Sequence, residues 1–210
     1  MNNLDKIKIK VCGMGSLQNM QNIDQLGVDY LGFIIHEASP RHLKDTQLLR
    51  VPTKAEKVLI TKNMQQERLS FLAKKHAIKW LQLHGNESVK TCTHYKNQGF
   101  QLIKTISIST EDDFQTATSY REVVDFLLFD TASKLGGGSG IPFNWQWLKH
   151  YISTTGFFLS GGISVEDASI IREIGHPGMV GIDLNSRFEI KPGLKNISTL
   201  KKFIHDIKEQ

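Results

Sequence analysis

Residues 157–184 of the chain read FFLSGGISVEDASIIREIGHPGMVGIDL. The run opens with a short apolar strand at 157–159, which the small pair Gly161-Gly162 ends. Ser164 then begins a helix, and Asp167, three residues later, is placed to complete a capping box. A second apolar strand follows at 179–184. A parallel return needs a crossover, so two strands joined through a helix predict a parallel β-α-β unit.

The same alternation runs outward from this unit over the rest of the chain. Earlier strands are predicted at 6–12, 28–35, 58–61, 80–83, 102–106 and 123–129, and a final helix carries the apolar stripe Leu200, Phe203, Ile204 and Ile207. About eight such units without a break in composition predict a single catalytic domain over 1–210, an α/β protein folded as one (β/α)8 TIM barrel with short helices and loops. The rival is an open doubly wound sheet, but Cys12-Gly13-Met14-Gly15 is only a fragment of its Gly-x-Gly-x-x-Gly motif.

Composition and charge exclude several classes of protein. The 210 residues are 40% hydrophobic and 22% charged, which is the balance of a soluble globular protein. No apolar run approaches the ~18 to 20 residues that span a bilayer, and no secretory signal precedes the first strand, so we expect a cytoplasmic protein without a membrane partner. The net charge of +5 is scattered along the chain, which favours a small anionic substrate over nucleic acid.

Cysteines and histidines do not form a framework or a metal site in this sequence. Cys12 and Cys92 cannot build a disulfide scaffold, and the eight histidines lack the spacing of metal ligands. No long apolar surface stripe is predicted either, and we therefore expect a monomer without a metal.

Four polar side chains stand at predicted strand ends, where a barrel places its active site: Cys12, His84, Asp130 and Asp183. Each has an ordinary alternative. A lone cysteine is often a small buried hydrophobe, and a lone histidine is often structural. Asp130 follows the apolar run 123–129, so its carboxylate is either paired, capping a loop, or set up for catalysis.

Small residues after the late strands predict a phosphate site. They are Gly137 and Gly138, Gly161 and Gly162, and Asn185 and Ser186. Unobstructed backbone N–H groups can approach an anion closely, and barrels often bind phosphate beside strands seven and eight. Arg41, which follows Ser39-Pro40, either holds a carboxylate by two hydrogen bonds or lies solvated on an exposed loop.

An ordered series of motifs carries a resemblance to a known family. The series is Lys10-Val11-Cys12-Gly13, Ser39-Pro40-Arg41, Leu81-Gln82-Leu83-His84-Gly85, Asp130-Thr131, Gly137-Gly138-Ser139-Gly140, Leu159-Ser160-Gly161-Gly162, Ile182-Asp183 and Pro192-Gly193. Over essentially the whole chain it resembles phosphoribosylanthranilate isomerase, a small barrel enzyme of tryptophan biosynthesis. The resemblance implies an Amadori rearrangement of N-(5-phosphoribosyl)anthranilate to 1-(2-carboxyphenylamino)-1-deoxyribulose 5-phosphate, without a cofactor or a metal.

The resemblance also implies a role for each site residue. Cys12 is similar to the family's general base and Asp130 to its general acid, while Arg41 would hold the anthranilate carboxylate. Phosphate would lie on the loops of Gly137-Gly138, Gly161-Gly162 and Asn185-Ser186, with His84 and Asp183 lining the pocket.

The chemistry agrees with an acid and a base in these places. Opening the ribose ring needs a proton on the ring oxygen, which a carboxylic acid can donate. A base must then remove the proton from C2, and a thiolate can do so. An ordinary cysteine, with a pKa ≈ 8.5, is only partly ionised at neutral pH. Cys12 therefore needs either a lowered pKa or a proton taken from it during binding.

Several positions depart from the family pattern: Gly15, Ser16, Asn19, Ile141 and Arg187. They leave open how the first loop is held and whether Arg187 contacts phosphate or points outward. Two rival functions also stay open. One is another phosphosugar enzyme, although the epimerase would need metal ligands and the histidine-pathway isomerase a carboxylate in place of Cys12. The other is a non-catalytic barrel that binds a phosphorylated metabolite.

Overall fold

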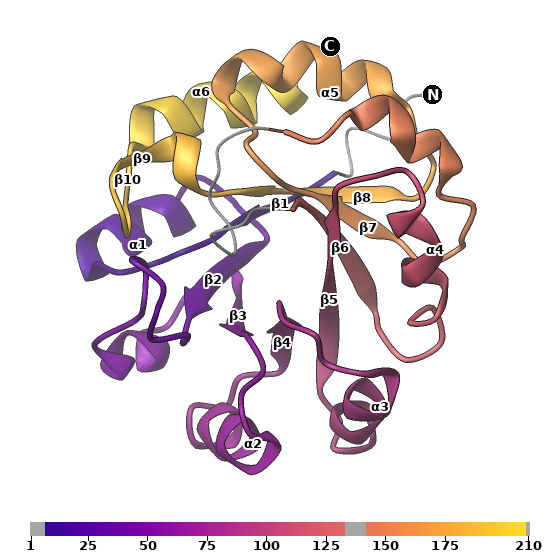
Figure 1. The fold of residues 1–210 in the computed structure, drawn as a ribbon. Helices are drawn as coiled ribbons and strands as arrows, with labels where there is room; N and C mark the ends of the chain where they lie inside the picture. The colour runs from indigo at the N-terminus through magenta and orange to yellow at the C-terminus, as the bar shows by residue number, and fades with distance from the viewer. Residues whose placement is uncertain (1–6, 133–141, 209–210) are drawn as a thin grey trace.

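The computed structural model describes residues 7–132 and 142–208 as a closed barrel of eight parallel strands, in which β1 pairs with both β2 and β8 (Figure 1). The strands are β1 (Lys8–Val11), β2 (Tyr30–Ile34), β3 (Glu56–Thr61), β4 (Trp80–Leu83), β5 (Gln101–Ile108), β6 (Phe126–Thr131), β7 (Phe157–Leu159) and β8 (Met179–Leu184). The prediction of a closed barrel is confirmed, and the open sheet is wrong.

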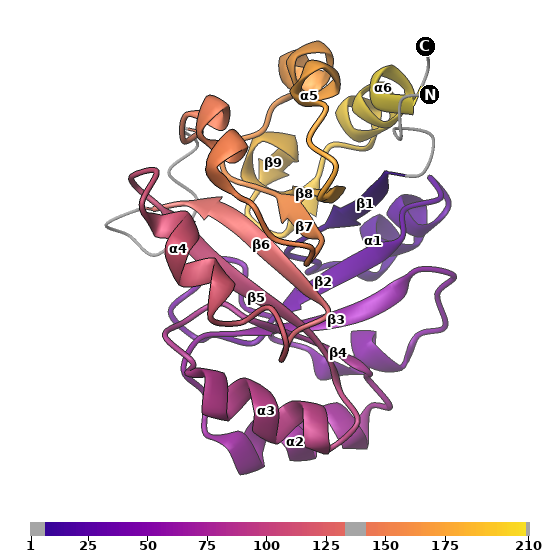
Figure 2. The ribbon, with the colours of Figure 1, turned by 90° about the vertical axis from the view of Figure 1, so that its right-hand side faces the viewer.

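Short helices and turns cover the outside of the barrel, as the chain length predicts. The α-helices are α1 (Leu17–Asp24), α2 (Gln66–Lys75), α3 (Val89–Asn97), α4 (Asp113–Thr118), α5 (Ala168–Ile174) and α6 (Ile197–Lys208). The 3₁₀ turns are η2 (Thr46–Arg50), η3 (Trp145–His150), η4 (Val165–Asp167) and η5 (Ser186–Phe188). Helices α2 and α3 lie on one side of the barrel and α5 and α6 on the opposite side (Figure 2). None of the helices described here is long and apolar enough to cross a membrane.

The predicted capping box is present before α5. The backbone N–H and the hydroxyl of Ser164 both donate to Asp167 Oδ2, at 2.7 and 2.8 Å. The predicted stripe of the last helix is also confirmed, because Leu200, Phe203, Ile204 and Ile207 are all buried. These local signals place the loops after β7 and β8, which carry part of the candidate site.

Apolar side chains fill the barrel below the site. The inner cluster contains Tyr30, Val58, Ile60, Trp80, Ile103, Leu128 and Phe158, and it also includes Cys12. Tyr30 meets Trp80 edge to face at 5.2 Å between ring centroids. Since Cys12 follows β1 directly, its thiol lies where the apolar filling meets the open end of the barrel.

A small antiparallel hairpin, β9 (Glu189–Lys191) with β10 (Leu194–Lys195), follows β8 and was not predicted from the sequence. It lies outside the barrel beside α1 (Figure 1). Buried Asn19 of α1 donates to the backbone oxygen of Lys195 at 2.9 Å and accepts from its N–H at 2.8 Å. The hairpin therefore joins the first helix of the chain to the segment after the last barrel strand.

Candidate active site

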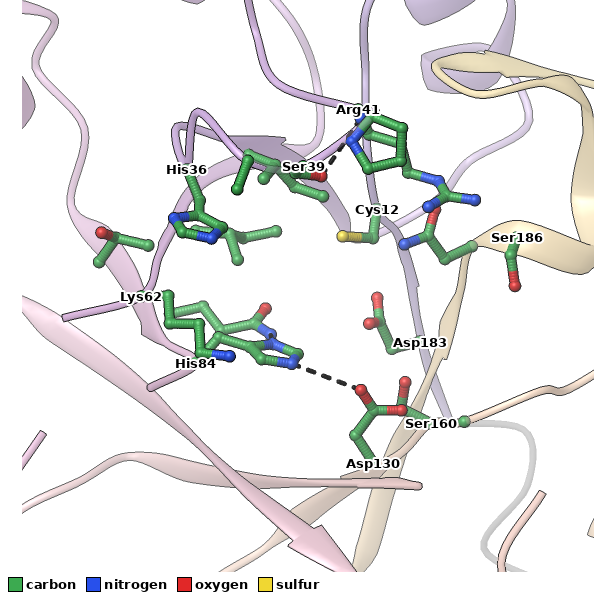
Figure 3. A pocket seen from close by; sticks show the side chains of 18 of the residues that line it. Cys12, His36, Ser39, Arg41, Lys62, His84, Asp130, Ser160, Asp183 and Ser186 are labelled. Atoms are coloured by element: carbon green, nitrogen blue, oxygen red, sulfur yellow. Dashed lines mark hydrogen bonds and ion pairs between the residues drawn. The ribbon is translucent and has the colours of Figure 1, made fainter. Parts of the chain in front are cut away.

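A cavity of about 480 Å³ opens at the carboxyl ends of the barrel strands (Figure 3). Every predicted site residue that the structure describes lines it: Cys12, Arg41, His84, Asp130, Gly161, Gly162, Asp183, Asn185 and Ser186. Gly137 and Gly138 lie outside the described residues. Among the lining residues that sequence reasoning did not single out are Lys62 and Gln82.

Cys12 is held in the barrel wall between β2 and β8. Its N–H donates to Leu184 O at 2.9 Å, and its side chain is almost fully buried. Gly32 makes room for it, since a Cβ there would lie 3.1 Å from Cys12 Cα and 2.7 Å from Ile60 Cδ1. Burial raises the pKa of Cys12 to about 11, although the Lys10 ammonium opposes that rise. A lowered pKa, the first of the two predicted alternatives, is therefore wrong for the unliganded site.

Lys10 and Asp183 form a buried ion pair below Cys12. Lys10 Nζ lies 2.8 Å from Asp183 Oδ1, with side-chain exposures of 0% and 5%. The two residues are register partners on neighbouring strands β1 and β8, which brings the charges together. Asp183 was predicted as a site residue, but Lys10 was not.

A chain of polar contacts leads from the barrel interior to Asp130. His84 Nε2 lies 3.4 Å from Asp130 Oδ2, and Thr131 N–H donates to Asp130 Oδ1 at 3.0 Å. On the other side of the imidazole ring, Gln82 Nε2 lies 3.2 Å from His84 Nδ1 and donates to Thr105 Oγ1 at 3.1 Å. If the amide donates to Nδ1, that nitrogen is the acceptor and Nε2 carries the hydrogen toward Asp130.

Arg41 reaches the cavity, but one edge of its guanidinium is already bound. Its Nε lies 3.0 and 2.9 Å from the two carboxylate oxygens of Glu189, and Nη2 donates to Oε2 at 2.7 Å. Lys195 Nζ also donates to Glu189 Oε1 at 2.7 Å and to Asn185 Oδ1 at 2.7 Å. Burial would raise the pKa of Glu189, but Arg41 and Lys195 hold it below its ordinary value. Within the described residues the Nη1 group and one Nη2 hydrogen of Arg41 have no partner, so a ligand can bind them.

The glycines after β7 have the backbone shape that an anion site needs. Gly161 and Gly162 have φ values of 90° and 71°. A Cβ on Gly161 would lie 2.4 Å from Thr131 Oγ1, so a side chain does not fit there. Ser186, at the start of η5, lines the same cavity (Figure 3). Together these loops present backbone N–H groups and hydroxyls on one side of the cavity.

Comparison with known proteins identifies the family of this chain. The family model described as N-(5'phosphoribosyl)anthranilate (PRA) isomerase matches residues 9–206. The chain belongs to the N-(5'-phosphoribosyl)anthranilate isomerase family. The isomerase of this name from Parabacteroides distasonis is 42% identical over 204 residues, covering 95% of this chain and 92% of that protein. The one from Phocaeicola vulgatus is 37% identical over 202 residues, covering 96% and 98%.

Solved structures of the family have the same fold. The phosphoribosyl anthranilate isomerase of Thermotoga maritima superposes with a TM-score of 0.83 at 25% identity, covering 96% of this chain and 98% of that one. Another solved isomerase, in complex with reduced 1-(o-carboxyphenylamino)-1-deoxyribulose 5-phosphate, has a TM-score of 0.81 at 25% identity, with coverage of 96% and 98%. The predicted family and enzyme class are thus confirmed. The rival interpretation as a phosphosugar epimerase is wrong.

The departures from the isomerase family pattern have structural accounts at three positions. Asn19 binds both backbone groups of Lys195, and Gly15 lets the first loop approach the hairpin, since a Cβ there would lie 3.2 Å from Gly193 O. Arg187 is exposed and does not line the cavity in the described part of the chain. The first loop is therefore held by the hairpin, and of the two predicted readings of Arg187 this position favours the outward one. Ile141 lies outside the described residues.

Proposed function

We propose that the chain catalyses the Amadori rearrangement of N-(5-phosphoribosyl)anthranilate in tryptophan biosynthesis, with Asp130 as general acid and Cys12 as general base. The observation that carries the assignment is that the thiol and the carboxylate reach one cavity from β1 and β6, on different sides of it (Figure 3). An acid and a base so placed can act on two different atoms of one bound sugar.

The acid step needs a carboxyl proton at the ring oxygen. Asp130 donates it as the C1–O bond breaks, which leaves an iminium between C1 and the aromatic nitrogen. His84 Nε2, 3.4 Å from Asp130 Oδ2, fixes the carboxyl group and can bind the carboxylate that remains. The iminium acidifies the neighbouring C2–H bond and prepares it for the base.

The base step needs Cys12 as a thiolate. With its pKa at about 11, the thiol form dominates in the unliganded site at neutral pH. The proton must therefore leave the sulfur during or after substrate binding, which is the second of the alternatives raised by the sequence. The thiolate then takes the C2 proton, and the enolamine that forms becomes the ketose when C1 gains a proton and the C2 hydroxyl loses one.

The proton balance links the two residues. After one turnover Cys12 has gained a proton and Asp130 has lost one, while the product is an isomer of the substrate. One proton must therefore pass from the sulfur to the carboxylate before the next turnover. No cofactor takes part in this cycle as proposed.

Two groups of cavity-lining residues can hold the two charged ends of the substrate. The phosphate is placed on the loop of Gly161 and Gly162 and beside Asn185 and Ser186. The carboxylate of the aromatic ring is placed on the available edge of Arg41. The substrate is thus a small anionic phosphosugar.

The compartment and the oligomeric state stay predictions. Cys12 and Cys92 are both free thiols, which suits a reducing compartment such as the cytoplasm. A Thermotoga maritima member of the family is described as dimeric. We keep the monomer for this chain, and light scattering of the purified protein tests it.

Complementation of a tryptophan auxotroph that lacks this isomerase tests the function. The chain is expected to restore growth, and Asp130→Asn is expected to fail because general acid–base catalysis contributes roughly 10²- to 10⁴-fold. Cys92→Ala is the matched control, since Cys92 is buried on α3 away from the cavity. A well-expressed chain that does not restore growth, or an Asp130→Asn variant that does, contradicts the proposal. Failure of the unchanged chain favours a non-catalytic barrel, whereas growth of the Asp130→Asn variant removes Asp130 from the mechanism.

A further inference from the structure

The cavity has two chemically different halves. Over β6, β7 and β8 its lining is polar and glycine-rich. Over β2, β3 and the loop between them it carries the apolar side chains Ile34, Ala38, Pro40 and Ile60, with His36, Ser39 and Thr61 among them. An aromatic ring fits the apolar half, because apolar and aromatic groups bind by burying such surface. A negative group on that ring would need a cation in the same half.

Most cations near the cavity are already balanced. The charge of Lys10 is matched by Asp183, and Arg41 and Lys195 share Glu189. When Cys12 and Asp130 together carry one negative charge, as the proposed proton balance requires, these groups have no net charge. The proposed substrate is an anion at both ends, with a phosphate and a carboxylate. A site of zero net charge is a poor match for it.

Lys62 also lines the cavity, and it is not one of the cations paired with a carboxylate in this count. It follows β3 directly and lies across the cavity from Ser160 and Ser186, with Cys12 between the two sides (Figure 3). Within 7–132 and 142–208, no acidic group forms an ion pair with it. Its ammonium is therefore available to a ligand in the cavity.

Hydrogen bonds of the next residue hold the backbone at Lys62 in place, which fixes the position of its Cα atom beside the cavity. Asn63, the next residue, has a φ of 52°, and its N–H donates to Glu87 Oε1 at 2.7 Å. The other oxygen of this buried carboxylate accepts from Gly85 N–H at 2.9 Å. Asn63 Oδ1 in turn accepts from Asn86 N–H at 2.7 Å. The loops after β3 and β4 are thus braced against each other beside the cavity.

We propose that Lys62 binds the aromatic carboxylate of the substrate and, together with Arg41, determines specificity for a carboxylated ring. The proposal rests on the proposed function for the identity of the substrate. Lys62 contributes a point charge from β3, while Arg41 contributes the available edge of its guanidinium from the loop after β2. Figure 3 shows the two side chains on either side of Cys12, so the long side chain of Lys62 turns toward Arg41 to reach the same carboxylate.

The test compares Lys62→Met, Lys62→Arg and the control Lys79→Met with the unchanged protein. Lys79 is exposed at the amino end of β4, the other end of the barrel. Steady-state kinetics use N-(5-phosphoribosyl)anthranilate and its aniline counterpart, which lacks the carboxylate. Calorimetry measures Kd for the reduced product analogue with and without the same group. Thermal melting checks that the variants are folded.

Lys62→Met is expected to raise KM and Kd for the carboxylated compounds about tenfold with little change in kcat, the lower end of what a contact to a charged group contributes. For the compounds without the carboxylate the change is expected to stay below about twofold. Lys62→Arg should recover most of the loss, and added salt should shrink it, because the pair is partly exposed. Lys79→Met should change nothing.

Equal losses with and without the carboxylate, or no loss at all, overturn the proposal. The first result would place Lys62 on the phosphate instead. The binding arm needs no turnover. An unchanged protein that converts neither substrate therefore contradicts the proposed reaction, while the Kd comparison still decides the role of Lys62.

Discussion

Lys10 Nζ and Asp183 Oδ1 lie 2.8 Å apart inside the barrel, and water reaches almost none of either side chain. The pair joins β1 to β8 at the seam where the first and last strands close the barrel. Removing one member of such a pair leaves the other charge buried and unbalanced. The pair therefore stabilises the seam directly under Cys12.

Lys10→Met is expected to lower the free energy of unfolding by about 3 to 5 kcal/mol, the usual cost of an unpaired buried charge. Urea denaturation followed by circular dichroism measures it. The double variant Lys10→Met/Asp183→Asn should recover part of the loss. Lys202→Met is the control, because its pair with Asp206 is exposed and such pairs contribute about 0 to 1 kcal/mol. Similar losses in both single variants would contradict the buried pair.

The reactivity of Cys12 is expected to keep rising to high pH. In a Cys92→Ala background, the rate of alkylation by iodoacetamide follows the thiolate fraction. With a pKa of about 11, that rate should rise about ninefold between pH 9 and 10. A thiol with the ordinary pKa of ≈ 8.5 would rise less than about 1.5-fold over the same interval. A plateau that begins below pH 9 would show that burial does not control this thiol.

The raised pKa of Cys12 also makes the stability of the folded protein depend on pH. Its pKa in the folded protein is raised to about 11, above the ordinary value for an unfolded chain. The folded state thus keeps the proton more strongly, so this contribution is complete below pH ~8 and is lost as pH rises toward 11. Cys12→Ala should show a shallower loss of stability than the unchanged protein over that interval.

Arg41→Ala is expected to reduce kcat/KM about 10- to 150-fold, since a hydrogen bond to a charged group contributes about 1.5 to 3 kcal/mol. Glu189 keeps Lys195 and Gly193 N–H as partners in this variant, so the fold should survive. A substrate without the aromatic carboxylate should show little further loss. Arg68→Ala is the control, because Arg68 pairs with Glu37 on the surface. An equal loss for both substrates would mean that Arg41 does not contact this group.

Asn19→Ala is expected to destabilise the protein by about 2 to 6 kcal/mol. It removes the partners of two buried backbone groups of Lys195, each of which costs about 1 to 3 kcal/mol when left unpaired. The denaturation midpoint measures the loss. Asn22→Ala is a suitable control, since its bond to Gln18 is exposed on the same helix. A change below about 0.5 kcal/mol would show that the hairpin is not held by Asn19.

Apolar runs bounded by glycines made much of the barrel predictable. The strands predicted at 80–83, 157–159 and 179–184 agree with β4, β7 and β8 to the residue. The strand predicted at 123–129 is shifted, since β6 runs from Phe126 to Thr131. Polar residues at a strand end resemble a loop in sequence, but the open rim of a barrel accommodates them inside the strand.

The sequence did not predict the buried cations, for two physical reasons. Lys8 and Lys10 alternate with Ile7, Ile9 and Val11, a pattern typical of a solvent-facing strand side. In this barrel Lys10 instead points inward to Asp183. The pair of Arg41 and Glu189 joins positions 148 residues apart, so it depends on barrel closure and leaves no local signal.

The position of the β9–β10 hairpin in the sequence determines when the site is completed during synthesis. Arg41 is synthesised well before Glu189, which binds its guanidinium, and before Lys195, whose ammonium balances Glu189. Domains form as synthesis proceeds, beginning from the amino end. A nascent chain that has reached Leu184 has every strand of the barrel but no counter-ion for Arg41. The site is thus completed only after the last barrel strand has been made, and a product that ended at Leu184 would carry the thiol and the carboxylate beside an arginine without Glu189 to hold it.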